Sequence, residues 1–114
     1  MQEEQATYKY RVVWNEQKGS YEVHAIRPRI FSWLAIAPDS ARWFQLLQRI
    51  PSFHFHGQRG HYTARKEKRA RGGVYWIAYR HISGQLVKRY IGAPAAITIA
   101  RLEEVAGDLE IQAR

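Results

Sequence analysis

The fold is decided by residues 61–92, which read HYTARKEKRARGGVYWIAYRHISGQLVKRYIG. Three short runs of β-forming residues are separated by glycine-containing turns, and aromatic and basic side chains are interleaved along them. The stretch holds eight Lys and Arg residues and one Glu, a net charge of 8 − 1 = +7, against +8 for the whole chain of 114 residues. We therefore expect a small antiparallel sheet that concentrates nearly all of the excess positive charge.

A hairpin centred on Ser83-Gly84 is the clearest local feature of this stretch, because glycine follows serine between two β-rich runs. With these two residues in the loop, the facing pairs are His81 with Leu86, Tyr79 with Lys88, Ile77 with Tyr90, and Trp76 with Ile91. One face then carries Val74, Trp76, Ala78, Arg80, Val87, Arg89 and Ile91. The other face carries Tyr75, Ile77, Tyr79, His81, Leu86, Lys88 and Tyr90. A slip of one residue would exchange these sets.

The face with Trp76 and Ala78 is predicted to belong to the core, because a helix that can cover it follows in the chain. Residues 97–111 read ITIARLEEVAGDLEI, and their apolar side chains recur at helical spacing. On the outer side of this helix we expect Glu103, Glu104 and Asp108. The predicted unit is a three-stranded antiparallel sheet over residues 61–68, 73–81 and 86–91, with the C-terminal helix on one face and the other face free.

The first sixty residues predict a hairpin and a helix. Residues 8–14 and 20–26 alternate as two half-buried strands do, and Asp39 or Ser40 can cap a helical stripe that Pro51 ends. Residues 1–7 are polar and without periodicity, so we expect a disordered tail. The fold class is therefore α+β. We expect one domain over residues 8–114, in which a hairpin and helix (8–60) precede a sheet and helix (61–109).

Composition excludes several classes of protein. The chain has no cysteine, which removes disulfides, thiolate chemistry and Cys-based zinc sites. No apolar run approaches the roughly 18 residues that a membrane span needs, and the N-terminus is not a secretory signal. We expect a cytoplasmic protein that associates with the nucleoid and not with membranes.

No catalytic motif stands out, so we expect no enzyme and no cofactor. His54 and His56 share one face of a short strand and His61 follows, but no nearby carboxylate or cysteine completes a metal site. We interpret these histidines as the outer face of an edge strand and expect no metal.

The clustered bases and aromatics predict a nucleic-acid-binding surface, with duplex DNA as the expected ligand. The predicted contact residues are Arg65, Lys66, Lys68, Arg69, Arg71, Tyr75, Tyr79, Arg80, Lys88, Arg89 and Tyr90. Two alternatives stay open: single-stranded DNA or RNA stacking on the tyrosines, and a protein partner or a second copy docking on the basic sheet. The tyrosines could also be covered by the N-terminal hairpin.

Several segments of the chain resemble the sequences of known DNA-binding families. Tyr90-Ile91-Gly92, Ala78 and the helical segment ARLEEVA at residues 100–106 are similar to the DNA-binding domain of plant ethylene-response factors and to the arm-site-binding domain of tyrosine-recombinase integrases. That resemblance covers residues 61–109. It implies a sheet lying in the major groove, with Arg65 and Lys88 holding bases or phosphates, Tyr79 or Arg80 on the middle strand, and Tyr90 packing on sugar and base.

A second resemblance covers most of the chain. It is to a domain near the N-terminus of large LuxR-type (MalT-like) bacterial transcriptional regulators. The matching motifs are Thr63-Ala64-Arg65-Lys66-Glu67, Tyr75-Trp76, Ala78-Tyr79-Arg80, Lys88-Arg89-Tyr90 and Arg101-Leu102-Glu103. This resemblance implies a transcription-related DNA-binding role in a bacterium.

Overall fold

A computed structural model describes residues 9–114 of the protein. The predicted tail over residues 1–7 and the first residue of the predicted hairpin, Tyr8, lie outside the described residues.

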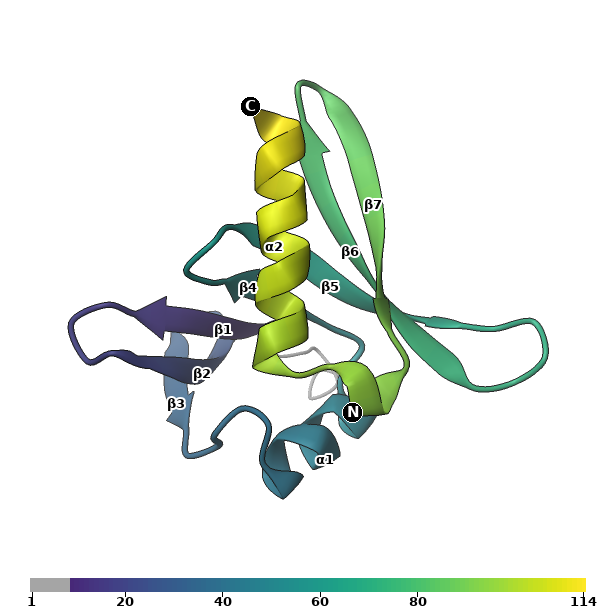
Figure 1. The fold of residues 1–114 in the computed structure, drawn as a ribbon. Coiled ribbons are helices and arrows are strands. Elements are labelled where there is room, and N and C mark those ends of the chain that lie inside the picture. The colour runs from purple at the N-terminus through teal and green to yellow at the C-terminus, as the bar shows by residue number, and fades with distance from the viewer. Residues whose placement is uncertain (1–8) are drawn as a thin grey trace.

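A single mixed sheet of seven strands forms the framework (Figure 1). The strands are β1 (Lys9–Asn15), β2 (Ser20–Arg27), β3 (Ile30–Leu34), β4 (Ser52–His56), β5 (His61–Lys68), β6 (Val74–Ile82) and β7 (Gln85–Gly92). Their order across the sheet is β3-β2-β1-β4-β5-β6-β7. The predicted three-stranded sheet is therefore wrong, because β5, β6 and β7 are only part of a larger sheet that continues through β4.

A parallel pairing joins the two halves of the sheet. β1 pairs with β2, and β2 with β3, in antiparallel fashion, and β4 to β7 form a second antiparallel meander. Between them β1 and β4 run parallel, with Arg11 opposite His54 and Val13 opposite His56. A parallel pair needs a crossover connection, which β2, β3 and the helix α1 (Ala41–Arg49) provide.

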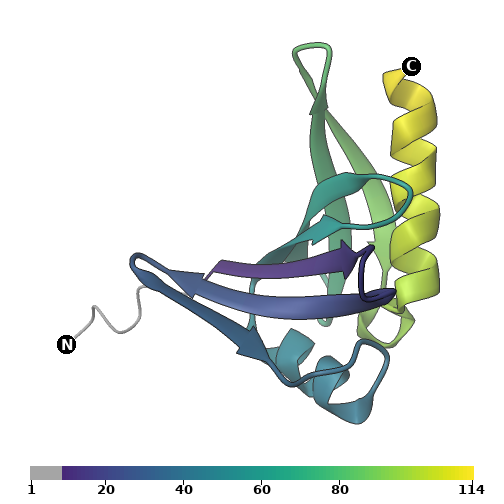
Figure 2. The same ribbon diagram turned by 90° about the vertical axis from the view of Figure 1, so that its left-hand side faces the viewer.

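Both helices cover the same face of the sheet. One continuous cluster of buried residues joins Trp43 and Leu47 of α1, Leu102 and Leu109 of α2 (Ile99–Ala113), and the inward side chains of the strands. After a quarter turn α2 lies to one side of the sheet (Figure 2). A short 3-10 helix, η2 (Pro94–Ala96), leads from β7 into α2. Within the described part of the chain, no helix is long and apolar enough to cross a membrane.

Side-chain capping starts each helix, and Ser40 is one of the two caps that the sequence predicts for α1. Ser40 accepts a hydrogen bond from the backbone N–H of Trp43, and Thr98 accepts one from that of Arg101, both at 3.3 Å. Each cap satisfies one of the free donors of the first turn. The ring N–H of Trp43 then donates to the carbonyl of Ile97 at 2.8 Å, which ties α1 to the start of α2 inside the core.

The β6–β7 hairpin has nearly the register that the sequence predicts. His81 faces Leu86, Tyr79 faces Lys88 and Ile77 faces Tyr90. Ser83 and Gly84 both have left-handed backbone, with φ of 52° and 81°, as a two-residue type I′ turn requires. The register changes between Trp76 and Ile77, so that Trp76 faces Gly92 and not Ile91. The predicted division of side chains between the two faces is confirmed despite this irregularity.

Glu103 of α2 is buried, which corrects the prediction that it lies on the outer side. Its side chain is 8% exposed and accepts hydrogen bonds from the Tyr21 hydroxyl at 2.5 Å and from the backbone N–H groups of Gln58 and Arg59 at 2.7 and 3.0 Å. Burial and the bond to Glu103 raise the pKa of Tyr21 to about 12. The carboxylate therefore joins α2, the β4–β5 turn and β2.

We predict that Glu103→Ala lowers the free energy of unfolding by about 2–3 kcal/mol, because three partly buried donors lose their acceptor. The matched control is Glu104→Ala, since Glu104 is exposed and pairs with Arg101 on the helix surface. Urea titrations of both variants measure the difference. Equal stability of the two variants would contradict a structural role for the Glu103 carboxylate.

Candidate nucleic-acid interface

The face of the sheet opposite the helices is uncovered by any described segment, and we call it the open face (Figure 2). Strand register assigns its side chains. They include Phe31 and Trp33 of β3, Glu22 and His24 of β2, Lys9 and Arg11 of β1, His54 and His56 of β4, His61, Thr63, Arg65 and Glu67 of β5, Tyr75, Ile77, Tyr79 and His81 of β6, and Leu86, Lys88 and Tyr90 of β7. The N-terminal hairpin extends this face instead of covering it.

Two cations of the open face lie against one tyrosine ring. The Lys88 Nζ is 5.5 Å from the centroid of the Tyr79 ring, and the Arg65 Cζ is 5.9 Å from the same centroid. Neither cation forms an ion pair with a carboxylate among residues 9–114. Both charges therefore remain available to an anion that approaches the face.

Glu67 lies on the same face of β5 as Arg65, and two tyrosine hydroxyls donate hydrogen bonds to it. Tyr75 donates to Glu67 Oε1 at 3.3 Å, and Tyr79 donates to Glu67 Oε2. The bond to Glu67 raises the pKa of Tyr79 above its ordinary value, and desolvation adds to the effect. The carboxylate thus fixes the two tyrosines while leaving Arg65 and Lys88 unpaired.

The β5–β6 turn carries two further bases and extends away from the helices (Figure 1). Arg69 and Arg71 are exposed there. The Arg69 guanidinium lies 4.7 Å from the Tyr75 ring centroid and donates to the Tyr90 hydroxyl at 3.2 Å. Because Tyr75 and Tyr90 lie on the open face, this arginine connects the turn to that face. We call Arg65, Arg69, Arg71, Tyr75, Tyr79, Lys88 and Tyr90 the basic end of the open face.

Four predicted contact residues lie on the helix side of the sheet instead. One of them is Lys68, which ends β5, is exposed and lies opposite Val74 of β6. Lys66 donates to the carbonyl of Gln48 at 3.1 Å, and burial lowers its pKa. Arg80 pairs with Glu110 of α2 at 3.0 Å, and Arg89 donates to Gln112 of α2. Strict alternation along β5, β6 and β7 sets this placement, since neighbours in a strand point to opposite faces. The structure therefore does not bring these four together with the other seven.

The opposite end of the open face holds an aromatic cluster that the sequence did not reveal. The His24 ring lies between Phe31 and Trp33, with centroid distances of 4.8 and 5.4 Å, and is almost fully buried. Lys18 and Arg11 lie near these rings, with Lys18 Nζ 4.2 Å from the Trp33 centroid and Arg11 Cζ 6.0 Å from that of Phe31. We call His24, Phe31 and Trp33 the aromatic end.

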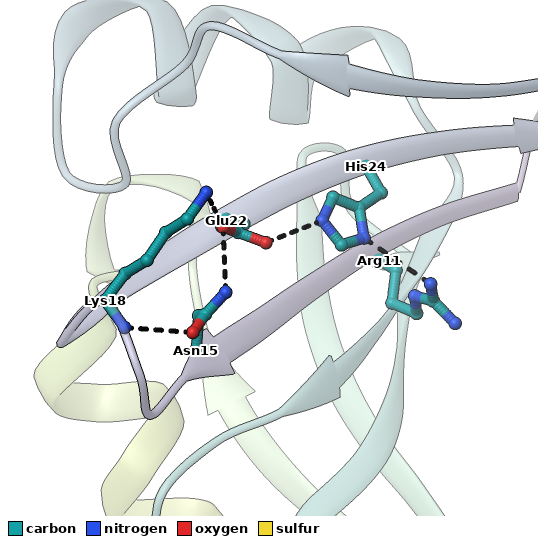
Figure 3. Close-up of polar contacts among 5 residues, drawn as sticks. All are labelled: Arg11, Asn15, Lys18, Glu22 and His24. Atoms are coloured by element: carbon teal, nitrogen blue, oxygen red, sulfur yellow. Dashed lines mark hydrogen bonds and ion pairs between the residues drawn. The ribbon is translucent and has the colours of Figure 1, made fainter.

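Polar contacts hold the aromatic end in place (Figure 3). Glu22 accepts from Asn15 at 3.1 Å, pairs with Lys18 at 3.3 Å and contacts His24 Nε2 at 3.1 Å, while Arg11 lies 3.5 Å from His24 Nδ1. Burial alone would raise the pKa of Glu22, but hydrogen bonds from His24, Lys18 and Asn15 lower it. The Glu22 charge is thereby satisfied within the cluster.

Between the two ends lie four exposed histidines, His54, His56, His61 and His81. The prediction that His54 and His56 belong to an edge strand is wrong, because β4 is the central strand of the sheet. The rings of His56 and His61 stack with centroids 5.8 Å apart, and His54 Nδ1 lies 3.0 Å from the Thr63 hydroxyl. Over the described part of the chain, no group of three or more metal-ligating side chains is arranged to hold an ion.

Comparison of the chain with family models, with curated proteins and with solved structures gives no match. The resemblances drawn from the motifs stay predictions, and the case for function rests on the geometry of the open face.

We predict that Glu67→Gln lowers the pKa of Tyr79 toward its ordinary value of 10.0, because the tyrosine loses a charged acceptor that favours its protonated form. Tyrosine ring NMR signals followed through an alkaline titration measure this change. Glu104→Gln removes an equal charge from the exposed side of α2 and should leave the Tyr79 titration unchanged. An unaltered Tyr79 pKa in the Glu67 variant would mean that the hydrogen bond is absent in solution.

Proposed function

We propose that the protein is a non-catalytic DNA-binding protein that places the basic end of its open face against duplex DNA. The single observation that carries this proposal is that Arg65 and Lys88 lie on an uncovered sheet face without a carboxylate partner among the described residues. Cations left unpaired on a broad face provide the sequence-independent attraction that a phosphate backbone needs.

The shape of the basic end supports this assignment. The major groove of B-DNA is about 12 Å wide and admits a two-stranded β-ribbon. The β6–β7 hairpin would present Lys88, Tyr79 and Tyr90 to the groove, and Arg65 follows on β5. Arg69 and Arg71 of the β5–β6 turn would contact phosphates, which position a protein without reading sequence. The resemblance to LuxR-type regulators supports a transcription-related role in the bacterial cytoplasm.

We expect duplex affinity to fall steeply with salt, with a slope of log K against log salt of about −4 to −7 if that many phosphates are contacted. Fluorescence anisotropy of a labelled duplex over a salt series measures the slope. A flat salt response would contradict the proposal.

A pair of arginine variants tests which face of the sheet binds. Arg65→Ala should weaken duplex binding about tenfold and reduce the salt slope by about one contact. Arg89→Ala removes the same charge from the helix side, where Arg89 contacts Gln112, and should change the affinity much less. Equal losses in both variants would show that net charge, and not the open face, determines binding.

A second candidate function is the binding of single-stranded DNA or RNA, and the exposed aromatics favour it. Tyr90 and Phe31 are each 50% exposed and Trp33 is 55% exposed, all on the open face. Stacking of unpaired bases on such rings contributes about 1–3 kcal/mol per base.

Trp33→Ala separates the two candidates. Under the single-strand model it should weaken binding of an oligonucleotide without secondary structure about tenfold. Under the duplex model the same substitution leaves duplex affinity within about twofold, because Trp33 lies outside the basic end. Parallel titrations with single-stranded and duplex forms of one sequence distinguish the outcomes.

A further inference from the structure

The middle of the open face contains a hollow that the basic end does not explain. It has a volume of about 290 Å³, and the open-face side chains that line it are His54, His56, His61, Thr63, Tyr79 and His81. They come from β4, β5 and β6, so the sheet order alone brings them together. Tyr62 and Arg80 also line the hollow, but their polar groups contact α2 on the helix side.

The charged groups around this hollow are positive. Lys9 and Arg11 of β1 lie beside His54, and Arg65 of β5 follows Thr63 on the same face. The two carboxylates of the open face are engaged elsewhere, Glu67 by Tyr75 and Tyr79 and Glu22 by Lys18, Asn15 and His24. Among residues 9–114, no carboxylate lines the hollow.

This environment disfavours protonation of the two central histidines in the free protein. Burial, and then Lys9 and Arg11, lower the pKa of His54. Burial, and then His61, Arg11 and His54, lower the pKa of His56. Both pKa values are lowered because burial and neighbouring positive charges destabilise the protonated ring. These rings are therefore neutral at pH 7 and gain protons only below their ordinary titration range.

We propose that the histidine hollow is a second phosphate-binding site, which holds phosphodiester groups of the bound nucleic acid when its histidines are protonated. The proposal rests on the proposed function, because it extends the same open face from the basic end across β4 toward Lys9 and Arg11. A phosphate in the hollow supplies the negative charge that the free protein lacks there, and a protonated imidazole donates from both ring nitrogens.

The coupling between phosphate binding and protonation of the histidines sets how strongly duplex affinity depends on pH. When a bound ligand raises the pKa of a protein group, that group takes up protons as the complex forms. The affinity for the ligand then changes by up to about tenfold per pH unit for each proton taken up. With one to two protons bound at the hollow, duplex affinity should rise roughly 10- to 100-fold between about pH 7.5 and pH 5.5. Phosphodiesters stay ionised throughout this range, so the rise would come from the protein.

The test is a set of anisotropy titrations with a labelled duplex of about 20 base pairs at constant ionic strength and at about pH 7.5, 6.5 and 5.5. The wild type should show the rise, and the double variant His54→Gln with His56→Gln should lose most of it while binding as well as wild type at the highest pH. The control Lys88→Ala should weaken binding by the same factor at every pH. Far-UV circular dichroism confirms folding at each pH.

The outcomes separate the two proposals. An absence of binding at every pH would refute the proposed DNA-binding function. Binding that is independent of pH, or a rise that persists in the double histidine variant, would refute the histidine site alone. A second readout does not depend on variants: the imidazole NMR signals of His54 and His56 should titrate at higher pH with the duplex bound than without it, and unchanged titration midpoints would also refute the site.

Discussion

The architecture depends on the parallel pairing of β1 with β4. Only three residue pairs make this ladder, from Arg11 opposite His54 to Val13 opposite His56. It nevertheless merges two antiparallel meanders into one sheet, and both helices pack on the same side of that sheet. Without it, the N-terminal hairpin could stack on the second meander and cover the tyrosines. The pairing therefore determines that one whole face stays uncovered.

The helix side supplies the fold with its core and with its polar anchors. Glu103 joins three separate segments, the Trp43 ring N–H reaches the start of α2, and the Tyr62 hydroxyl donates to the carbonyl of Leu102 at 2.9 Å. Buried polar groups with satisfied partners specify one arrangement of helix and sheet. Because these contacts fix α2, the open face can carry bases and histidines that contribute little to packing.

Sequence patterns predicted local structure well and strand neighbours poorly. Alternation and the Ser83-Gly84 turn predict the faces of the β6–β7 hairpin, because both are encoded within twenty residues. Nothing in SFHFH indicates that β4 lies at the centre of the sheet, since a strand pattern specifies which side chains share a face and not which strand lies beside it. Arg80 and Arg89 are counted among the predicted contact residues because of their charge. The same alternation already places their side chains on the helix side of the sheet.

The contacts of Arg65 and Lys88 suit a surface that must give up its own interactions when a ligand binds. A cation over an exposed ring gains about 0.5–1 kcal/mol, whereas fixing a lysine or arginine side chain costs about 2 kcal/mol of rotamer entropy. The Tyr79 ring can therefore bias these cations toward the open face without holding them rigidly. A carboxylate in its place would neutralise them and would have to be displaced by each incoming phosphate. Tyr75 and Tyr79 bind Glu67 through their hydroxyl groups, and Glu67 forms no ion pair with either cation among residues 9–114.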